Sequence, residues 1–541
     1  MSFFPKVEGK NDGPSPRATG SKRKLEIGKM SGMDSTNIQD MDTGQVNQLP
    51  LLVHAARSFR LRCLIDAQAD IEKAGVITKD EYQAALHVLL KEELRKAIIL
   101  REMERAEGEI TLETMVSMIE PFGMQASEII AAAFQLAVEG FLSCNVESPE
   151  TCTFKFMTSD PALVQPVYVP VKIVHDGLAC SGCGTCQAVC PVGCIAVDDG
   201  NVSIDMDKCI RCGLCYTACP RSFLPKKVME WATKNDAFTA DELKAGNYIE
   251  AWSARTLDGD IAKVAQDGGI SSSLLVQAFQ ANEISAAIGA GIKEGMPWKP
   301  EPRILRSVED IVSVAGTKYV NTPSLGLLQA LKDVPSIAVV GTPCMMQALK
   351  KIDIYPVGMV GTSNIKYRIG IFCMESFTHA SVKMLCEDTF GTSLDQVTKM
   401  NIKEGQFIAF TADGEQKSES MKEVTRLARL SCHCCHDLSS ELADISVGSI
   451  GSPDGWNSVL VRTPTGKALF DAAVDAGLIE KKQLDEVEPG IGMLKKLAMI
   501  KKRNYDKEQG KRDEAHEFHP SYYMKLPPKE KKKGESADPD A

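Results

Sequence analysis

The sequence predicts a multidomain chain with a helical, winged-helix-like N-terminal extension, a small cysteine-rich α+β domain and a larger α/β domain. Three observations support this prediction. Good helix formers fill residues 80–105, and one cysteine pattern occurs twice between residues 180 and 220. From residue 250 to residue 497, short β-rich runs alternate with helical stretches. The 541 residues suffice for about two to four domains of ordinary size.

Composition and charge exclude several classes of function. The net charge is −10 and the pI is about 5.5, which argues against a general nucleic-acid binder, because neutralising phosphate needs clustered Lys and Arg. The chain has 18 cysteines and its N-terminus lacks the apolar core of a secretory signal, so we expect metal ligation in the cytoplasm rather than disulfides. The most apolar stretch, residues 126–142, contains charged residues, and we expect no transmembrane segment.

The N-terminal extension is expected to have two parts. Residues 1–47 show no apolar period, which is typical of a disordered or partner-wrapping arm. Residues 48–165 are expected to form a helical domain. Its helices are predicted at residues 80–105, 113–119 and 127–138, and its two β-like pieces at 140–146 and 151–157. Helices followed by a strand pair form a winged-helix pattern.

Winged helices often bind DNA, but the charge of this one disfavours that role. Residues 107–157 contain eight Glu and one basic residue, Lys155. A groove-reading helix with this charge would be repelled by phosphate. We therefore expect a protein-docking domain.

A repeated cysteine motif gives the strongest signal in the chain. The pattern C-x2-C-x2-C-x3-C-P occurs twice in residues 171–225, ending first at Cys190-Pro191 and then at Cys219-Pro220. This is the ligand spacing of a two-cluster ferredoxin, in which thiolates bind two 4Fe-4S clusters and the fourth Cys of each run serves the other cluster. A structural zinc site would instead favour paired Cys doublets.

The spacing assigns four ligands to each ferredoxin cluster. The first set is Cys180, Cys183, Cys186 and Cys219, and the second is Cys190, Cys209, Cys212 and Cys215. Cys194 lies outside the motif and is expected to be a core thiol.

The α/β domain is expected over residues 246–500, after a helical linker at 226–246. Its strands are predicted near residues 337–340, 369–372, 445–447 and 459–461, and its helices near 271–281, 324–332, 381–390 and 467–476. Residues 501–541 are expected to form an extended, solvated tail that begins basic and ends acidic.

Four further cysteines in this domain stand in unusual strings. Cys344 ends GTPC, Cys373 lies in FCMES, and Cys432 and Cys435 lie in CHCC. The spacing alone also fits buried thiols, which most lone cysteines are. Cys435 is preferred over Cys434 as a ligand because it preserves C-x2-C spacing.

Several longer strings give the domain a family resemblance. They are AQDGG at 265–269, AGTKY at 315–319, VGTPC at 340–344, GIFCMESF at 370–377 and ELADISVGS at 441–449, continued by GSPDGW at 451–456. Together they resemble the beta subunit of coenzyme F-420-reducing hydrogenase and its relatives, archaeal formate dehydrogenase beta subunits and the F-420H2 dehydrogenase input subunit. The resemblance covers about residues 171–497 and leaves out residues 1–165.

The resemblance implies an archaeal flavoprotein subunit that reduces or oxidises coenzyme F-420. It implies a bound FAD and a third 4Fe-4S cluster, held by Cys344, Cys373, Cys432 and Cys435. A deazaflavin carries hydride and a cluster carries one electron, whereas a flavin can exchange both and so connects them. No catalytic nucleophile is expected in such a chain, and no catalytic residue is singled out.

Small residues and one lysine are the candidates for contacting FAD. Gly268, Gly269 and Ser271 are expected to open a helix, whose N-terminus would suit the pyrophosphate. Lys318 could pair with phosphate or the flavin pyrimidine. The remaining candidates lie in the strings of the resemblance: Gly341, Thr342, Pro343, Glu375, Gly448, Ser449, Gly451, Ser452 and Trp456. Turns, a surface lysine and a core tryptophan are the alternatives.

The anionic tail of F-420 should meet basic side chains. Lys293, Lys299, Arg303 and Arg306 are the candidates.

The expected partner is a metalloenzyme that releases low-potential electrons. The candidates are a hydrogenase, a formate dehydrogenase, a carbon monoxide dehydrogenase and a formylmethanofuran dehydrogenase. Two alternatives stay open: a non-catalytic, ferredoxin-type conducting subunit, and an enzyme with another substrate, as in the related chlorophyll-reductase branch.

Overall fold

The computed structural model describes residues 93, 95–139, 141–145, 152–158, 171–209, 213–222, 242–354, 364–515 and 517–520. The expected arm at 1–47 and most of the linker at 226–246 lie outside this part of the chain. Among the helices in the described ranges, none is both long and apolar enough to cross a membrane.

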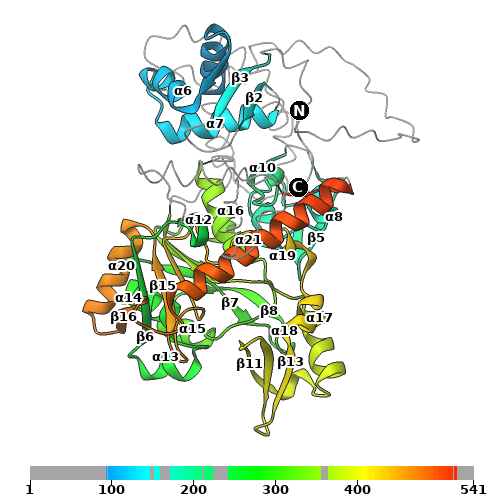
Figure 1. The fold of residues 1–541 in the computed structure, drawn as a ribbon, viewed down its shortest axis with the longest axis vertical. Coiled ribbons are helices and arrows are strands. Elements are labelled where there is room, and N and C mark those ends of the chain that lie inside the picture. Colours follow the sequence, from blue (N-terminus) through cyan, green and yellow to red (C-terminus); the bar gives the residue numbers. More distant parts are fainter. Residues whose placement is uncertain are drawn as a thin grey trace, which may run out of the picture.

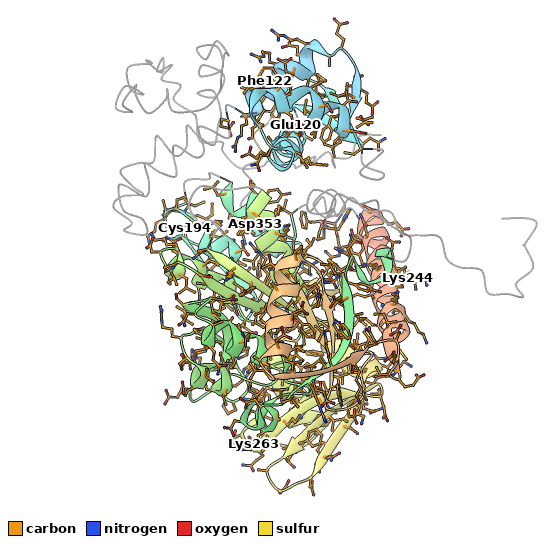
Figure 2. All side chains as sticks on the ribbon, turned by 90° about the vertical axis from the view of Figure 1, so that its left-hand side faces the viewer. Glu120, Phe122, Cys194, Lys244, Lys263 and Asp353 are labelled. Carbon is orange, nitrogen blue, oxygen red and sulfur yellow. The ribbon has the colours of Figure 1, made fainter. Side chains whose placement is uncertain are left out.

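The N-terminal unit occupies one end of the long axis of the molecule (Figure 1). Residues 95–105 are helical, and then come β1 (Glu109–Thr111), α6 (Leu112–Ile119), η2 (Glu120–Phe122), α7 (Ala126–Glu139), β2 (Leu142–Asn145) and β3 (Thr153–Phe156). The Thr111 hydroxyl caps α6 by accepting a 3.1 Å hydrogen bond from Thr114 N. Figure 2 labels Glu120 and Phe122 on this unit.

The three strands of this unit form an antiparallel sheet in the order β1-β3-β2. Phe134 of α7 packs edge-on against Phe154 of β3, with ring centroids 5.1 Å apart. The expected helices at 113–119 and 127–138 and the strand pair are therefore present, while the winged-helix classification stays a prediction.

The ferredoxin segment shows its duplication in the backbone. It comprises α8 (Lys172–Asp176), α9 (Thr185–Ala188), the hairpin β4 (Ile195–Asp198) and β5 (Asn201–Ile204), and α10 (Leu214–Ala218). Left-handed glycines, Gly184 (φ 85°) and Gly213 (φ 76°), directly precede α9 and α10. A Cβ on Gly184 would lie 2.5 Å from Pro323 O, so a side chain there would also separate this segment from the large domain.

An eight-stranded mixed sheet forms the centre of the α/β domain, in the order β16-β6-β15-β14-β10-β9-β7-β8. The strands are β6 (Glu250–Thr256), β7 (Ala286–Ile292), β8 (Pro300–Leu305), β9 (Ile337–Gly341), β10 (Ile365–Ile371), β14 (Ile445–Gly448), β15 (Asn457–Val461) and β16 (Ile479–Gln483). The four strands β7, β9, β10 and β14 pair in parallel, and the flanking strands are antiparallel. The expected α/β class is confirmed.

Helices cover both faces of the sheet. One face packs against α13 (Gly259–Val264), α14 (Ile270–Gln280), α15 (Val308–Ser313) and α20 (Pro464–Asp475). The other face packs against η3 (Ser324–Leu331) and α16 (Pro343–Ile354). Cys183, Val189 and Leu214 share the hydrophobic core of this second face, so the ferredoxin segment is packed onto it. The stretch expected as a helix at 324–332 forms a 3-10 helix.

A smaller subdomain lies at the other end of the molecule (Figure 1). It contains α17 (His379–Met384), the π-helical turn η4 (Leu385–Thr389), η5 (Leu394–Gln396), and the antiparallel strands β11 (Val397–Lys403), β12 (Gln406–Thr411) and β13 (Gln416–Ser420). The chain returns through α18 (Met421–Val424), η6 (Thr425–Leu427) and α19 (Leu430–His433). Cys432 lies on α19.

The chain after residue 500 corrects one expectation. Residues 501–514 are not extended, because α21 spans Gly490–Glu514 and runs from the large sheet to the ferredoxin segment (Figure 1). Leu494, Ala498 and Tyr505 form its buried stripe together with basic residues. Arg512, on that stripe, donates to Gly177 O at 2.6 Å.

Candidate functional site

The first cysteine group, group I, consists of Cys180, Cys183, Cys186 and Cys219. Burial raises the pKa of Cys186 well above its usual value, and the neighbouring thiols of the other three raise it further. The charges of the other three thiols act on Cys186, so the fold brings all four together. Cys219 belongs to the second copy of the motif, whereas Cys180, Cys183 and Cys186 belong to the first.

The second cysteine group, group II, consists of Cys190, Cys209, Cys212 and Cys215, of which Cys212 lies outside the described residues. Burial raises the pKa of Cys215 to about 11, and the charges of Cys190 and Cys209 contribute to the rise. Cys194, expected to be a core thiol, is buried and its Sγ lies 3.4 Å from the Sγ of Cys190. Figure 2 labels it on the ferredoxin segment.

Four thiols of the α/β domain form group III: Cys344, Cys373, Cys432 and Cys435. Burial raises the pKa of Cys373, and the charges of Cys432, Cys344 and Cys435 raise it further. The structure therefore brings together four thiols from strings that are up to ninety residues apart. Cys434 is 1 % exposed and belongs to the hydrophobic cluster that also contains Cys186, Cys190 and Cys219.

Backbone N–H groups point at the sulfur atoms of all three groups. Gly182 N donates to Cys180 Sγ at 3.3 Å, Val171 N to Cys215 Sγ at 3.4 Å and Ser376 N to Cys432 Sγ at 3.3 Å. Such donors stabilise thiolates and tune the potentials of iron–sulfur clusters. Within the described ranges no three His, Cys, Asp or Glu side chains converge as ligands of a single metal ion. Four thiols per group match the number of protein ligands of a 4Fe-4S cubane.

The three groups form a row. The charge of Cys344 acts on Cys180 and the charge of Cys183 acts on Cys344, which places group I next to group III. The charge of Cys215 acts on Cys186, which places group II next to group I. The order II–I–III leads from the ferredoxin segment into the α/β domain.

Buried and half-buried basic side chains accompany the row, and the sequence alone does not single them out. Lys351 donates to Cys219 O at 2.7 Å, Arg429 donates to Cys180 O at 3.1 Å, and Arg221 donates to Cys434 O at 2.8 Å. Lys501 of α21 donates to Cys373 O. In the sequence these residues are scattered basic positions, and only their burial beside cysteines distinguishes them.

The structure brings together three of the segments predicted to contact FAD. Asp267 is hydrogen bonded to Ser449, and Ile270 N donates to Asn457 Oδ1 at 3.3 Å. The charge of Asp267 also acts on Tyr319, the neighbour of Lys318. The strings around residues 267, 318 and 449 therefore lie side by side, and α14 begins at Ile270 as expected.

The glycines in these segments are also required by packing. A Cβ on Gly268 would lie 2.6 Å from both Ala254 O and Asn457 N, and one on Gly448 would lie 2.2 Å from the Phe372 ring. Gly451 has a φ of 102° and approaches Gly490 O. Gly269 caps α14 with a φ of 72°. Side chains on these glycines would displace strands and helices, so the glycines fix the shape of the loops.

Lys318 contributes a positive charge to this region, and Trp456 contributes an aromatic ring. Lys318 Nζ donates to the carbonyls of Val314, Ala315 and Gly316, and burial lowers its pKa to about 8. Trp456 is 9 % exposed and lies between the cations of Arg255 and Lys482. Ser452 Oγ and Ser458 Oγ lie 2.9 Å apart. Ser271, in the first turn of α14, is half-buried.

The remaining predicted residues lie beside group III. The Thr342 hydroxyl is 3.1 Å from Cys344 Sγ, at the start of α16. Gly341 ends β9 and Pro343 begins α16. Glu375 accepts a 2.7 Å hydrogen bond from Thr425, and burial raises the pKa of its carboxyl.

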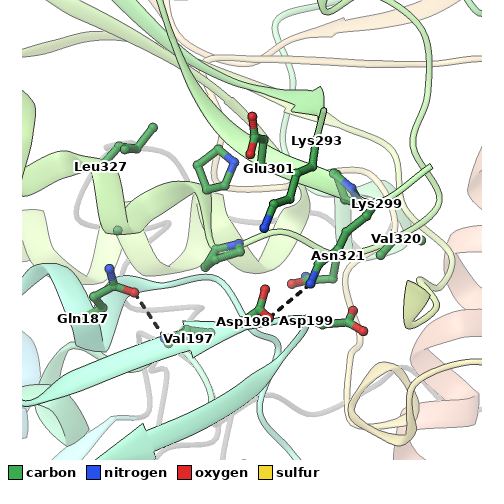
Figure 3. A pocket seen from close by; sticks show the side chains of 14 residues that line it. Gln187, Val197, Asp198, Asp199, Lys293, Lys299, Glu301, Val320, Asn321 and Leu327 are labelled. Carbon is green, nitrogen blue, oxygen red and sulfur yellow. Dashed lines mark hydrogen bonds and ion pairs between the residues drawn. The ribbon is translucent and has the colours of Figure 1, made fainter. Parts of the chain in front are cut away.

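A cavity of about 230 Å³ separates the ferredoxin hairpin from β7, β8 and η3 (Figure 3). Lys293 and Lys299, two of the residues expected to bind the F-420 tail, line it, but so do Asp198, Asp199 and Glu301. Lys299 pairs with Asp198 at 3.2 Å. Arg303, outside the cavity lining, pairs with Glu301. The acidic lining and these ion pairs leave little free positive charge here, and Arg306 is exposed.

Comparison with known proteins covers both described domains after residue 171. Residues 172–220 match the family model of a 4Fe-4S dicluster domain. Residues 251–329 and 334–487 match the N-terminal and C-terminal models of the coenzyme F-420 hydrogenase/dehydrogenase beta subunit.

Two curated relatives and one solved structure illustrate the similarity. The coenzyme F-420 hydrogenase subunit beta of Methanococcus voltae is 36% identical, over 49% of this chain and 94% of its own length. An F(420)H(2) dehydrogenase component of Methanosarcina mazei is 33% identical, over 62% of this chain and 93% of its own. A chain of the F-420-reducing [NiFe] hydrogenase complex from Methanosarcina barkeri is 36% identical, over 50% of this chain and 94% of that chain, with a TM-score of 0.49.

Proposed function

Because the chain belongs to the family of coenzyme F-420 hydrogenase/dehydrogenase beta subunits, we propose that it is the F-420 oxidoreductase subunit of an electron-transferring complex, with three 4Fe-4S clusters and FAD. The family and the dicluster domain support an oxidoreductase role and iron–sulfur clusters. We place the complex in the cytoplasm, because twelve thiolate ligands need a reducing compartment.

The row of three cysteine groups is the observation that carries the proposal. The groups are adjacent in the order II–I–III, and group III lies inside the domain that resembles F-420-dependent enzymes. Clusters at these cysteines would supply single-electron transfer, and FAD would supply the exchange between single electrons and hydride. A subunit that only conducted electrons between its partners would not need its cysteine groups to end inside the domain that resembles F-420-dependent enzymes.

The residues of the chain hold and shield these groups. Backbone N–H donors and buried cations stabilise the thiolates, while the burial of Cys183, Cys186, Cys219, Cys344 and Cys435 excludes water from the sulfur atoms. We assign FAD to the region where the segments around Asp267, Lys318 and Ser449 meet. There the N-terminus of α14 and the Lys318 ammonium offer positive charge to a diphosphate.

Anaerobic F-420 reduction by the reconstituted chain tests the proposal. With reduced methyl viologen as the donor, we expect loss of the F-420 absorbance and one FAD bound per chain. Other acceptors assayed in parallel separate F-420 from a different substrate. A protein that binds its clusters but no flavin, and does not react with F-420, would be the non-catalytic conducting subunit.

Lys318 provides a specific test of the flavin site. Replacing Lys318 with Met should weaken FAD binding tenfold or more, since charged hydrogen bonds contribute about 1.5–3 kcal/mol. Because burial lowers the pKa of this lysine to about 8, FAD affinity should fall above that pH in the wild type, as the ammonium that attracts the diphosphate loses its proton. The variant should lose this dependence. Flavin fluorescence titration measures both effects.

Lys263, an exposed lysine of the same domain paired with Asp260, is the matched control, and Lys263→Met should leave FAD affinity unchanged. Equal affinity of the wild type and the Lys318→Met variant would move the flavin away from Lys318.

The N-terminal extension is proposed to dock the partner, a metalloenzyme such as a hydrogenase, formate dehydrogenase, carbon monoxide dehydrogenase or formylmethanofuran dehydrogenase. Deleting residues 1–165 should spare viologen-driven F-420 reduction and abolish coupling to the native partner. The assay compares the two donors on the same preparation. Loss of flavin from the truncated chain would show that the extension supports the fold instead.

A further inference from the structure

Arg221 occupies a position between two cysteine groups. It follows Cys219-Pro220, the end of the second ferredoxin motif, and is 2 % exposed. Its backbone N–H donates to Cys219 Sγ at 3.4 Å, which anchors it to group I. Its guanidinium donates to Cys434 O at 2.8 Å and is hydrogen bonded to the side chain of Cys435 in group III.

Arg221 lies beside both groups. Its backbone lies against Cys219 of group I, and its guanidinium lies against the Cys434–Cys435 segment that carries a ligand of group III. A buried cation is stabilised by neighbouring negative charge, which ligand thiolates of both groups would supply.

The side chains of the other basic residues along the row each contact one group, and Arg429 among them is half-buried. Arg429 donates to Cys180 O, and its charge acts on Cys180. Lys351 contacts Cys219 O. The ammonium of Lys501 interacts electrostatically with the thiols of Cys435, Cys373 and Cys432, all in group III. These one-sided cations provide matched comparisons for Arg221.

We propose that Arg221 is a residue whose charge acts on both the cluster of group I and the cluster of group III and thereby keeps both reducible at the junction of the two domains. The inference rests on the proposed clusters. Each cluster becomes more negative on reduction, and two adjacent anions repel each other. A guanidinium held between them attracts an electron added to either cluster, so it raises both midpoint potentials and compensates for the lowering that each reduced cluster imposes on the other.

Redox titration of the full chain, monitored by electron paramagnetic resonance, tests the inference. In Arg221→Gln, the midpoint potentials of both clusters should become more negative than in the wild type. Arg429→Gln should lower only the potential of group I, and Lys501→Gln only that of group III. Arg221→Lys, which keeps the charge, should recover most of the shift.

The signals can be assigned with a Cys373→Ala variant, which should lack the signal of group III. Arg221→Gln must retain the wild-type iron content for the comparison to count, and the Lys variant serves as the probe if the Gln variant does not. Unchanged potentials, or a shift confined to one cluster, with all signals present would overturn the role of Arg221. A wild type without a group III signal would instead contradict the proposed function.

Discussion

Replacing Cys373 with Ala is expected to remove one of three clusters, and iron should fall from about twelve to about eight atoms per chain at four irons per cubane. Cys373 follows β10, and its thiol shares a site with Cys344, Cys432 and Cys435. The variant should also stop partner-driven F-420 reduction, because the row of groups is interrupted, while hydride exchange with bound FAD persists. Iron analysis and electron paramagnetic resonance measure the loss.

Cys434→Ala is the matched control for this prediction. Cys434 is the neighbour of Cys435 in the chain and is also buried, but the largest charge influences on its thiol come from Arg512 and Arg221, with Glu508 and Cys435 contributing less. Its replacement should leave the iron content unchanged. Eight irons in the fully loaded wild type, or loss of a cluster from Cys434→Ala but not from Cys435→Ala, would refute the assignment of group III.

The spacing of the ferredoxin cysteines predicted local geometry well, because each run wraps its ligands within one short turn and helix. Gly184 and Gly213 take the left-handed conformations that open α9 and α10. Three of the predicted β-rich runs correspond to β9, β10 and β14 in the parallel centre of the large sheet, since strands buried on both faces read as continuous apolar stretches, and the fourth corresponds to the antiparallel β15. The antiparallel edge strand β16 was not predicted, because its sequence, IEKKQ, is largely charged.

Most of the site contacts that were not predicted from the sequence are charge interactions and hydrogen bonds between residues far apart in the chain. Arg221 looks like an ordinary basic residue after a Cys-Pro pair, and its environment depends on Cys434 and Cys435, more than two hundred residues away. The pairing of Asp267 with Ser449 likewise depends on two loops meeting at one edge of the sheet. Local pattern carries no information about such contacts.

Contacts between distant residues also explain why the part of α21 beyond residue 500 was not predicted as a helix. The buried stripe of this helix contains Lys501, Lys502 and Arg512, so its periodicity resembles that of a solvated segment. Each cation meets a partner from elsewhere in the chain: Lys501 meets Cys373 O, Lys502 pairs with Glu441, and Arg512 meets Gly177 O. The prediction of an extended tail failed because these partners were invisible in sequence.

The pair Lys502–Glu441 should therefore be essential for attaching α21. Both side chains are almost completely buried, at 0% and 1% exposure. Lys502→Ala leaves the Glu441 carboxylate in the interior without this ammonium, and breaking a buried pair in this way costs about 3–5 kcal/mol. We expect a markedly lower unfolding midpoint and faster proteolysis within α21. Chemical denaturation followed by circular dichroism, together with limited proteolysis, measures these changes.

A double-mutant cycle separates the pair from simple loss of packing. Lys502→Met with Glu441→Leu removes both charges and retains apolar volume, so it should recover most of the stability lost in either single variant. Lys496→Met, at an exposed position of the same helix, should change stability by less than about 0.5 kcal/mol. If Lys502→Ala were no more destabilising than Lys496→Met, α21 would be held by its apolar stripe alone. A double variant as unstable as the singles would show that the geometry of the ion pair, rather than the unpaired charge, fixes the helix.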